Sequence, residues 1–149
     1  MSLKDQIVED MKTAMKAGDK DRLKVVRLIL AAIKQIEVDT RQELDNTAIL
    51  AVLSKMVKQR HDSIEQFDKG ERKDLSAIEQ AEIVVIEGYL PEQLSADEIA
   101  TMVNDVIAAT NAKSIRDMGK VMGQIKAKAT GRADMGAVSA TVKERLNAL

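Results

Sequence analysis

Residues 20–38 read KDRLKVVRLILAAIKQIEV and carry apolar side chains at helical spacing over most of their length. These side chains fall on two sides of one predicted helix: Leu23, Val26, Leu30 and Ile33 on one side, and Val25, Ile29, Ala32 and Ile36 on the other. A helix that is apolar on two sides is typically the central, buried helix of its domain. The segment therefore predicts a helical core built around residues 20–38.

The composition of the chain favours the same fold class, all-α. Its 149 residues include one Pro and seven Gly, and residues that favour helices, such as Ala, Leu, Lys, Glu and Met, are abundant. Phe67 and Tyr89 are the only aromatic residues, so the core is expected to be aliphatic. Apolar residues make up 45% of the chain, which is too many for a disordered protein.

Several functional classes are excluded by what the chain lacks. Without Cys there is no disulfide, no thiolate nucleophile and no cysteine-based zinc site. The single His, His61, precedes Asp62 and Ser63, but successive residues of a helix point in different directions and form no catalytic triad. The chain contains no run of about 18 apolar residues, so the sequence predicts no membrane span. Residues 1–10 lack the apolar core of a signal peptide. We therefore expect a cytoplasmic protein with no metal, no cofactor and no catalytic residues.

Helical periodicity and turn residues predict six further helices outward from residues 20–38. They span residues 3–17, 46–68, 72–87, 95–110, 115–129 and 134–147. Residues 88–91, Gly-Tyr-Leu-Pro, are the clearest break, since Gly suits the end of a helix and Pro prevents its continuation. We place a domain boundary there. The expectation is a four-helix subdomain over residues 1–90, packed with a three-helix tail subdomain over residues 91–149.

Two charged residues lie within the apolar faces of predicted helices. Arg60 is in the middle of the apolar stripe of residues 46–68, and Glu82 is in that of residues 72–87. Both are equally far along the chain from the intervening loop, so an antiparallel hairpin sets them at the same level. A buried charge without a partner is costly. We therefore predict a structural ion pair between Arg60 and Glu82, with Glu79 as a second acceptor; a catalytic carboxylate with a raised pKa is the alternative.

The strongest local charge lies in residues 113–132, where six basic side chains accompany one acidic side chain, Asp117. The basic residues are Lys113, Arg116, Lys120, Lys126, Lys128 and Arg132. The core face of this predicted helix consists of Met118, Met122, Ile125 and Ala129. At about 100° per residue, the lysines and arginines lie opposite or beside that face. A basic stripe on one helix is typical of a contact with nucleic-acid phosphates, and a solvated lysine face is the competing interpretation.

Gly119 and Gly123 lie one turn apart beside the basic stripe. Each costs roughly 1 kcal/mol relative to Ala in a helix, so a compensating role is expected. That role is either close packing with another helix or the close approach of a bound polyanion. Because bases stack on aromatic side chains, which this segment lacks, we expect any RNA contact at the backbone of structured RNA. The predicted nucleic-acid site therefore combines the six basic residues with Gly119 and Gly123.

Residues in both halves of the chain carry a resemblance to a known family. In the first half they are Lys58-Gln59-Arg60, Ser63, Phe67, Gly70, Arg72, Asp74-Leu75, Glu79, Glu82 and Tyr89-Leu90-Pro91. In the second half they are Met118-Gly119-Lys120-Val121-Met122, Lys126, Gly131-Arg132-Ala133-Asp134, Val138-Ser139, Val142-Lys143 and Leu146. Together they resemble the YqeY-like proteins, free-standing relatives of the C-terminal tail found in one subunit of the tRNA-dependent Asp/Glu amidotransferase. The resemblance covers essentially the whole chain.

The resemblance implies two packed helical subdomains and an association with tRNA. In the amidotransferase the tail contacts the body of the tRNA, away from the chemistry, and the family label is a carbon–nitrogen ligase with glutamine as amido-N-donor. The glutaminase and the ATP-dependent kinase site belong to other domains or subunits, so the resemblance favours a binding module that is not catalytic by itself. The alternatives are a protein-interaction adaptor that docks on an amidotransferase or an aminoacyl-tRNA synthetase, and an amidoligase component.

Overall fold

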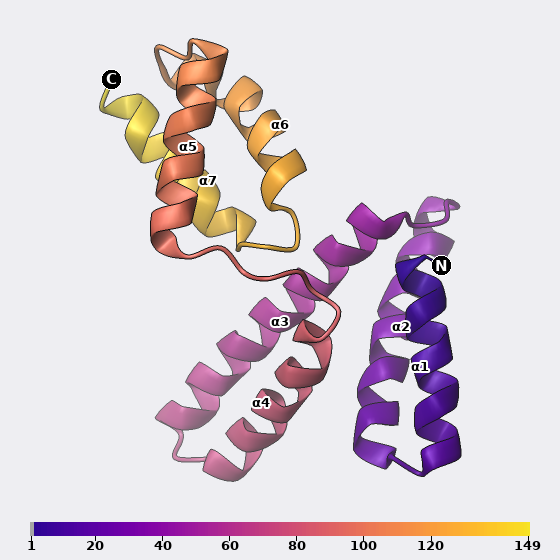
Figure 1. Ribbon diagram of the computed structural model, residues 1–149. Helices are drawn as coiled ribbons and strands as arrows, with labels where there is room; N and C mark the ends of the chain where they lie inside the picture. The colour runs from indigo at the N-terminus through magenta and orange to yellow at the C-terminus, as the bar shows by residue number, and fades with distance from the viewer. Residues whose placement is uncertain (1) are drawn as a thin grey trace. The chain divides into compact units, whose positions relative to one another are not determined.

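The computed structural model describes residues 2–149 and contains only helices in that range: seven α-helices and one short 3-10 helix. This confirms the all-α class. The chain forms two compact units, Met1–Pro91 and Glu92–Leu149 (Figure 1). Within the described residues, no helix is both long enough and apolar enough to cross a membrane.

The first unit consists of two helical hairpins. Its helices are α1 (Leu3–Ala17), α2 (Lys20–Thr40), α3 (Asn46–Lys69) and α4 (Lys73–Glu87). The helix α2 contacts each of the other three, so it does take the central place that the sequence predicts for residues 20–38. The core is aliphatic, and its buried side chains are Ile7, Val25, Val26, Ile29, Ile33, Ile49, Leu53, Met56 and Ile86.

Both apolar sides that the sequence assigns to α2 contribute buried residues. Val25, Val26, Ile29 and Ile33 are buried, whereas Ile36 is 36% exposed. At about 100° per residue, the two apolar sides adjoin each other and make one broad face. Solvent covers the rest of α2, which therefore lies at the surface of the unit although three helices contact it.

The second unit is a three-helix arrangement with its own core. It contains α5 (Ala96–Thr110), the 3-10 helix η1 (Ile115–Asp117), α6 (Met118–Ala129) and α7 (Met135–Asn147). The helices α5, α6 and α7 contact one another. Their contact surfaces are lined by Val103, Val106, Ala112, Val121, Ile125, Ala129, Ala133, Val138, Val142 and Leu146, which are all buried.

Local capping explains most helix boundaries. Ser95 and Glu98 form the predicted capping box at the start of α5, and Asp134 accepts a hydrogen bond from the amide of Gly136 at the start of α7. The prediction of one α-helix over residues 115–129 is wrong at its first turn. There the Ser114 side chain accepts from the amide of Arg116, and η1 precedes α6. A 3-10 turn at a helix terminus is common because it winds more tightly than an α-helix.

A hydrogen bond anchors the turn after α4 to α1. The Tyr89 hydroxyl donates to the Asp10 carboxylate at 2.5 Å, and Arg22 lies 3.7 Å from the same carboxylate. Burial, together with this hydrogen bond, raises the pKa of Tyr89 to about 12. The break that the sequence predicts at residues 88–91 is therefore held against α1 by a side-chain hydrogen bond.

Tyr89 should ionise at a higher pH in the folded protein than in the denatured protein. The stability of the fold should therefore fall at alkaline pH. The pKa of Tyr89 lies above the ordinary value of 10.0, so its contribution to stability is complete below pH 10 and is lost as the pH rises towards about 12. Tyrosinate absorbance measures this directly, because the chain has one Tyr and no Trp. Denatured protein is the reference, and Tyr89→Phe should remove this part of the alkaline dependence of stability. Folded protein that ionises near pH 10 would contradict the expectation.

Candidate functional site

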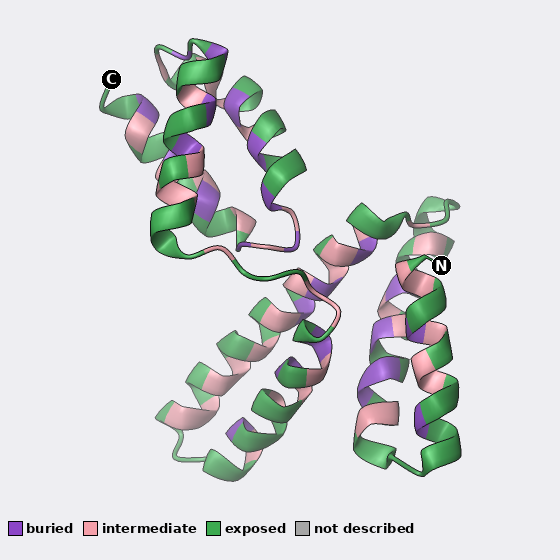
Figure 2. Cartoon of the chain, in the orientation of Figure 1, coloured by how far each residue is buried: buried purple, intermediate pink, exposed green. Residues whose placement is uncertain are grey.

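Five of the six predicted phosphate ligands are exposed on the second unit, and these residues are here called the basic ridge. It consists of Lys113, Arg116, Lys120, Lys126 and Lys128. Among the described residues, none of these five side chains forms an ion pair. Figure 2 shows α6 with buried residues along one side and exposed residues along the other. The ridge cations are therefore available to an external anion.

The orientation of α6 follows from its buried residues. Val121, Ile125 and Ala129 are fully buried, whereas Met118 and Met122 are only half-buried. The buried face of α6 is therefore rotated slightly from the predicted core face, which omitted Val121 and placed both methionines at its centre. The rotation keeps the three lysines of α6 exposed. The missed signal is the spacing of Val121, Ile125 and Ala129, which recur every four residues.

The one acidic residue of the segment is occupied by the backbone. The Asp117 carboxylate accepts hydrogen bonds from the amides of Lys113 at 2.8 Å and Ser114 at 3.4 Å. The Lys113 amide is the main cause that holds the pKa of Asp117 below its usual range, and the charges of Lys120 and Lys113 add to it. Asp117 therefore stabilises the entry to η1 without forming an ion pair with a ridge side chain.

The sixth predicted ligand, Arg132, is placed differently from the ridge. It is half-buried in the loop between α6 and α7, and its Nε donates to the carbonyl of Glu92 at 3.2 Å. Its own carbonyl accepts from the amide of Leu94 at 2.8 Å. Arg132 thus holds the segment before α5 against this loop. Its sequence position next to the other cations did not reveal this role, because both partners lie about 40 residues away.

Gly119 and Gly123 both lie on the exposed side of α6. A Cβ built on either glycine meets no atom within 4 Å, apart from its own helix backbone and chain neighbours. Close packing against another helix, one of the two explanations offered by the sequence, therefore has no support in the structure. Ala127 is exposed one turn further along. These three small residues lie beside Lys120 and Lys126 on the exposed side of α6 and leave the helix backbone accessible.

Arg60 and Glu82 meet between α3 and α4 in the first unit. Arg60 Nε lies 2.9 Å from Glu82 Oε2, and the two side chains are 13% and 12% exposed. A second guanidinium nitrogen donates to the carbonyl of Met56 at 3.2 Å. Among the described residues no hydrogen bond or ion pair involves Glu79, the predicted second acceptor. The other charged neighbour of Glu82 is Lys24 on α2, at 3.9 Å.

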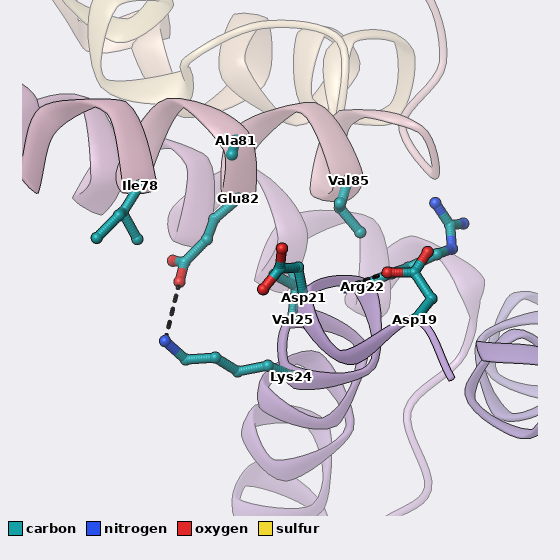
Figure 3. Close-up of a pocket in the computed structure, with 9 residues that line it drawn as sticks. All are labelled: Asp19, Asp21, Arg22, Lys24, Val25, Ile78, Ala81, Glu82 and Val85. Carbon is teal, nitrogen blue, oxygen red and sulfur yellow. Dashed lines mark hydrogen bonds and ion pairs between the residues drawn. The ribbon is translucent and has the colours of Figure 1, made fainter. Parts of the chain in front are cut away.

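A pocket of about 360 Å³ opens between the start of α2 and the middle of α4 (Figure 3). Ile78, Glu82 and Val85 extend from α4 towards the first turns of α2. The full lining comprises Asp19, Asp21, Arg22, Lys24, Val25, Ile78, Ala81, Glu82 and Val85. An amidoligase site built on Arg60, Glu79 and Glu82 would gather all three around a cavity. Of these, only Glu82 lines this pocket, and it is already paired, which counts against that interpretation.

The protein is all-helical and has two units, with the paired charges of Arg60 and Glu82 in the first unit and exposed cations on the second. Among residues 2–149 no group of His, Asp or Glu side chains is placed to hold a metal ion. The chain belongs to the family of YqeY-like proteins, whose family model matches residues 4–146.

Similar proteins come from several fungi and share one name, "Altered inheritance of mitochondria protein 41, mitochondrial". The protein of Lachancea thermotolerans is 30% identical over 141 residues, which cover 90% of this chain and 75% of the relative. That of Pyrenophora tritici-repentis is 30% identical over 142 residues, covering 93% and 78%. That of Saccharomyces cerevisiae strain YJM789 is 30% identical over 122 residues, covering 78% and 66%.

These names contradict the expectation of a cytoplasmic protein, because the relatives are named as mitochondrial proteins. The expectation rested on the lack of an apolar signal segment in residues 1–10. Mitochondrial transit peptides are amphipathic and rich in Arg rather than apolar, so that criterion does not detect them. The names of the relatives therefore point to mitochondria rather than to the cytoplasm.

Proposed function

We propose that this protein is a tRNA-associated binding module whose second unit, like the amidotransferase tail, contacts the RNA backbone and is not catalytic by itself. The observation that carries the proposal is the basic ridge, five exposed cations without ion-pair partners among the described residues. Exposed cations attract phosphates and release counterions when they bind them. The family label of a glutamine-dependent carbon–nitrogen ligase would then describe the larger enzyme rather than this chain.

The shape of the ridge favours structured RNA over single strands. The lysines of α6 run from Lys120 to Lys128, so they extend over about 12 Å along the helix. Both aromatic residues, Phe67 and Tyr89, lie in the first unit, which leaves the second unit without a stacking platform for bases. Contacts to phosphates and sugars suit a folded RNA such as tRNA. The test is tRNA binding over a series of salt concentrations, where a steep loss of affinity with salt supports a phosphate contact.

The two open glycines supply a second test of the same site. Gly119→Ala and Gly123→Ala should each raise the free energy of unfolding by roughly 0.5–1 kcal/mol, because Ala favours the helix and its Cβ meets no neighbour. The same variants should weaken tRNA binding if the RNA backbone approaches the exposed side of α6. Thermal unfolding and a tRNA titration measure the two effects. Stabilised variants that bind tRNA as well as the parent would show that the glycines serve no RNA contact.

A protein-interaction adaptor, docking on an amidotransferase or an aminoacyl-tRNA synthetase, is the second candidate function. It predicts an exposed apolar surface, and α4 has one. Ile78 and Val84 are 51% and 71% exposed, and Ala77 and Ala81 beside them are also exposed. Exposed apolar patches on a folded protein commonly mark sites for partners. Binding through these apolar side chains would depend less on salt than binding of tRNA to the ridge, which distinguishes the two.

A further inference from the structure

The pocket between α2 and α4 continues into the exposed apolar surface of α4. Ile78, Ala81 and Val85 line the pocket, and their spacing of three and four residues places them on one side of the helix. Val25 of α2 closes the pocket from below and is itself buried. Ile78, at 51% exposure, therefore belongs both to the pocket and to the open surface. The apolar part of the pocket lining, Ile78, Ala81 and Val85 of α4 with Val25 of α2, is here called the apolar groove.

The charges at one side of this groove are unbalanced. Among the pocket cations, Arg22 lies 3.7 Å from Asp10, and Lys24 lies 3.9 Å from Glu82. The carboxylate of Asp19 accepts only the backbone amide of Arg22, at 3.2 Å. The side chain of Asp21 forms no hydrogen bond or ion pair within the described residues. The first turn of α2 thus presents two carboxylates beside the apolar groove, and no side-chain cation is paired with either of them.

We propose that the groove between α2 and α4 docks an amphipathic basic helix of a partner protein. The apolar side of that helix lies along Ile78, Ala81 and Val85, and a Lys or Arg beside that side reaches Asp19 and Asp21. A helix fits because grooves between helices receive apolar side chains at spacings of three, four and seven residues. A basic partner fits because Asp19 and Asp21 have no side-chain cation paired with them among the described residues. The proposal gives the adaptor candidate a defined surface and rests on that candidate function.

A display library of helical peptides, selected against the full chain, tests the partner chemistry. The expected result is enrichment of peptides with apolar residues at helical spacing next to Lys or Arg. Ile78→Asp, which puts a charge into the groove, and Asp21→Lys, which reverses the local charge, should each weaken a selected peptide by roughly tenfold or more. Both side chains are exposed, so neither change disturbs the core.

Val38→Asp is the matched control, because Val38 is 58% exposed on α2 and does not line the pocket. It should leave peptide binding unchanged. The proposal is overturned if selection enriches no peptide, if the enriched peptides are acidic or neutral, or if their binding survives Ile78→Asp and Asp21→Lys. The tRNA affinity of the same variants should equal that of the parent, so failure here and failure of the RNA-binding proposal are separate results.

Discussion

Reversing the charges of Lys120 and Lys128 to Glu is expected to weaken tRNA binding at low salt by roughly ten- to a hundredfold. Both side chains are exposed on α6 and have no ion-pair partner among the described residues. Each reversal removes an attraction to phosphate and adds a repulsion. The slope of log affinity against log salt should fall by about one for each lysine that contacts a phosphate. Titration of labelled tRNA at several salt concentrations measures both quantities.

The matched control reverses Lys16 and Lys55, two exposed lysines of the first unit, and so makes the same change in net charge. If the ridge is the RNA site, this control variant should bind tRNA almost as tightly as the parent. An equal loss in both double variants would mean that net charge alone governs binding. Equal binding by the parent and the Lys120/Lys128 variant would remove the RNA-binding proposal, and the basic ridge would then be a solvated surface.

Truncating Glu82 to Ala is expected to lower the free energy of unfolding of the first unit by about 2–4 kcal/mol. The change leaves the Arg60 guanidinium, only 13% exposed, without its carboxylate. An unpaired charge in such a place loses hydration without a compensating partner. Lys24, which is 67% exposed and 3.9 Å away, contributes little to this cost. Denaturant unfolding measures the difference, provided that the slope with denaturant concentration is unchanged.

Two further variants separate the ion pair from simple loss of packing. Glu79→Ala removes a half-buried carboxylate from the same helix and should cost less than about 1 kcal/mol, because no partner of Glu79 occurs among the described residues. The double variant Arg60→Met with Glu82→Leu should recover most of the stability, since an apolar pair needs no hydration. A Glu82→Ala variant as mild as Glu79→Ala would show that the pair contributes little to stability.

The pairing of Arg60 with Glu82 bears on catalysis as well as on stability. A general base or a nucleophile needs a carboxylate that can reach a substrate. Glu82 is held by Arg60 at 2.9 Å and is 12% exposed. The Arg60–Glu82 pair joins α3 to α4 and so favours one register of this hairpin, and this arrangement favours a structural role over a catalytic one.

Much of the secondary structure was predictable from short-range patterns. The capping box of Ser95 and Glu98, the left-handed Gly18 after α1 and the Asp19 cap of α2 are each built from residues within a few positions of one another. Even the contact of Arg60 with Glu82 could be inferred, because a short loop between antiparallel helices leaves little freedom of register. These features join residues that are close in the sequence, so residue type and spacing are enough to predict them.

Features that depend on distant segments were not predictable. The role of Arg132 depends on Glu92, and Lys24, the second charged neighbour of Glu82, comes from α2. The open space above Gly119 and Gly123 could not be read from the sequence, because no pattern states whether another helix covers a surface. Glu79 illustrates the same limit, since its position allowed a contact that packing did not make.

The sequence by itself determined that this protein is all-helical, where most of its helices begin and end, and which charges concentrate near α6. Only the tertiary structure decided which of those charges face solvent, that α2 is buried on one broad face, and that a pocket opens beside α4. The physical reason is the separation along the chain of the residues that interact. Helices and caps arise from hydrogen bonds between near neighbours, whereas exposure and pockets arise from the packing of side chains from different helices.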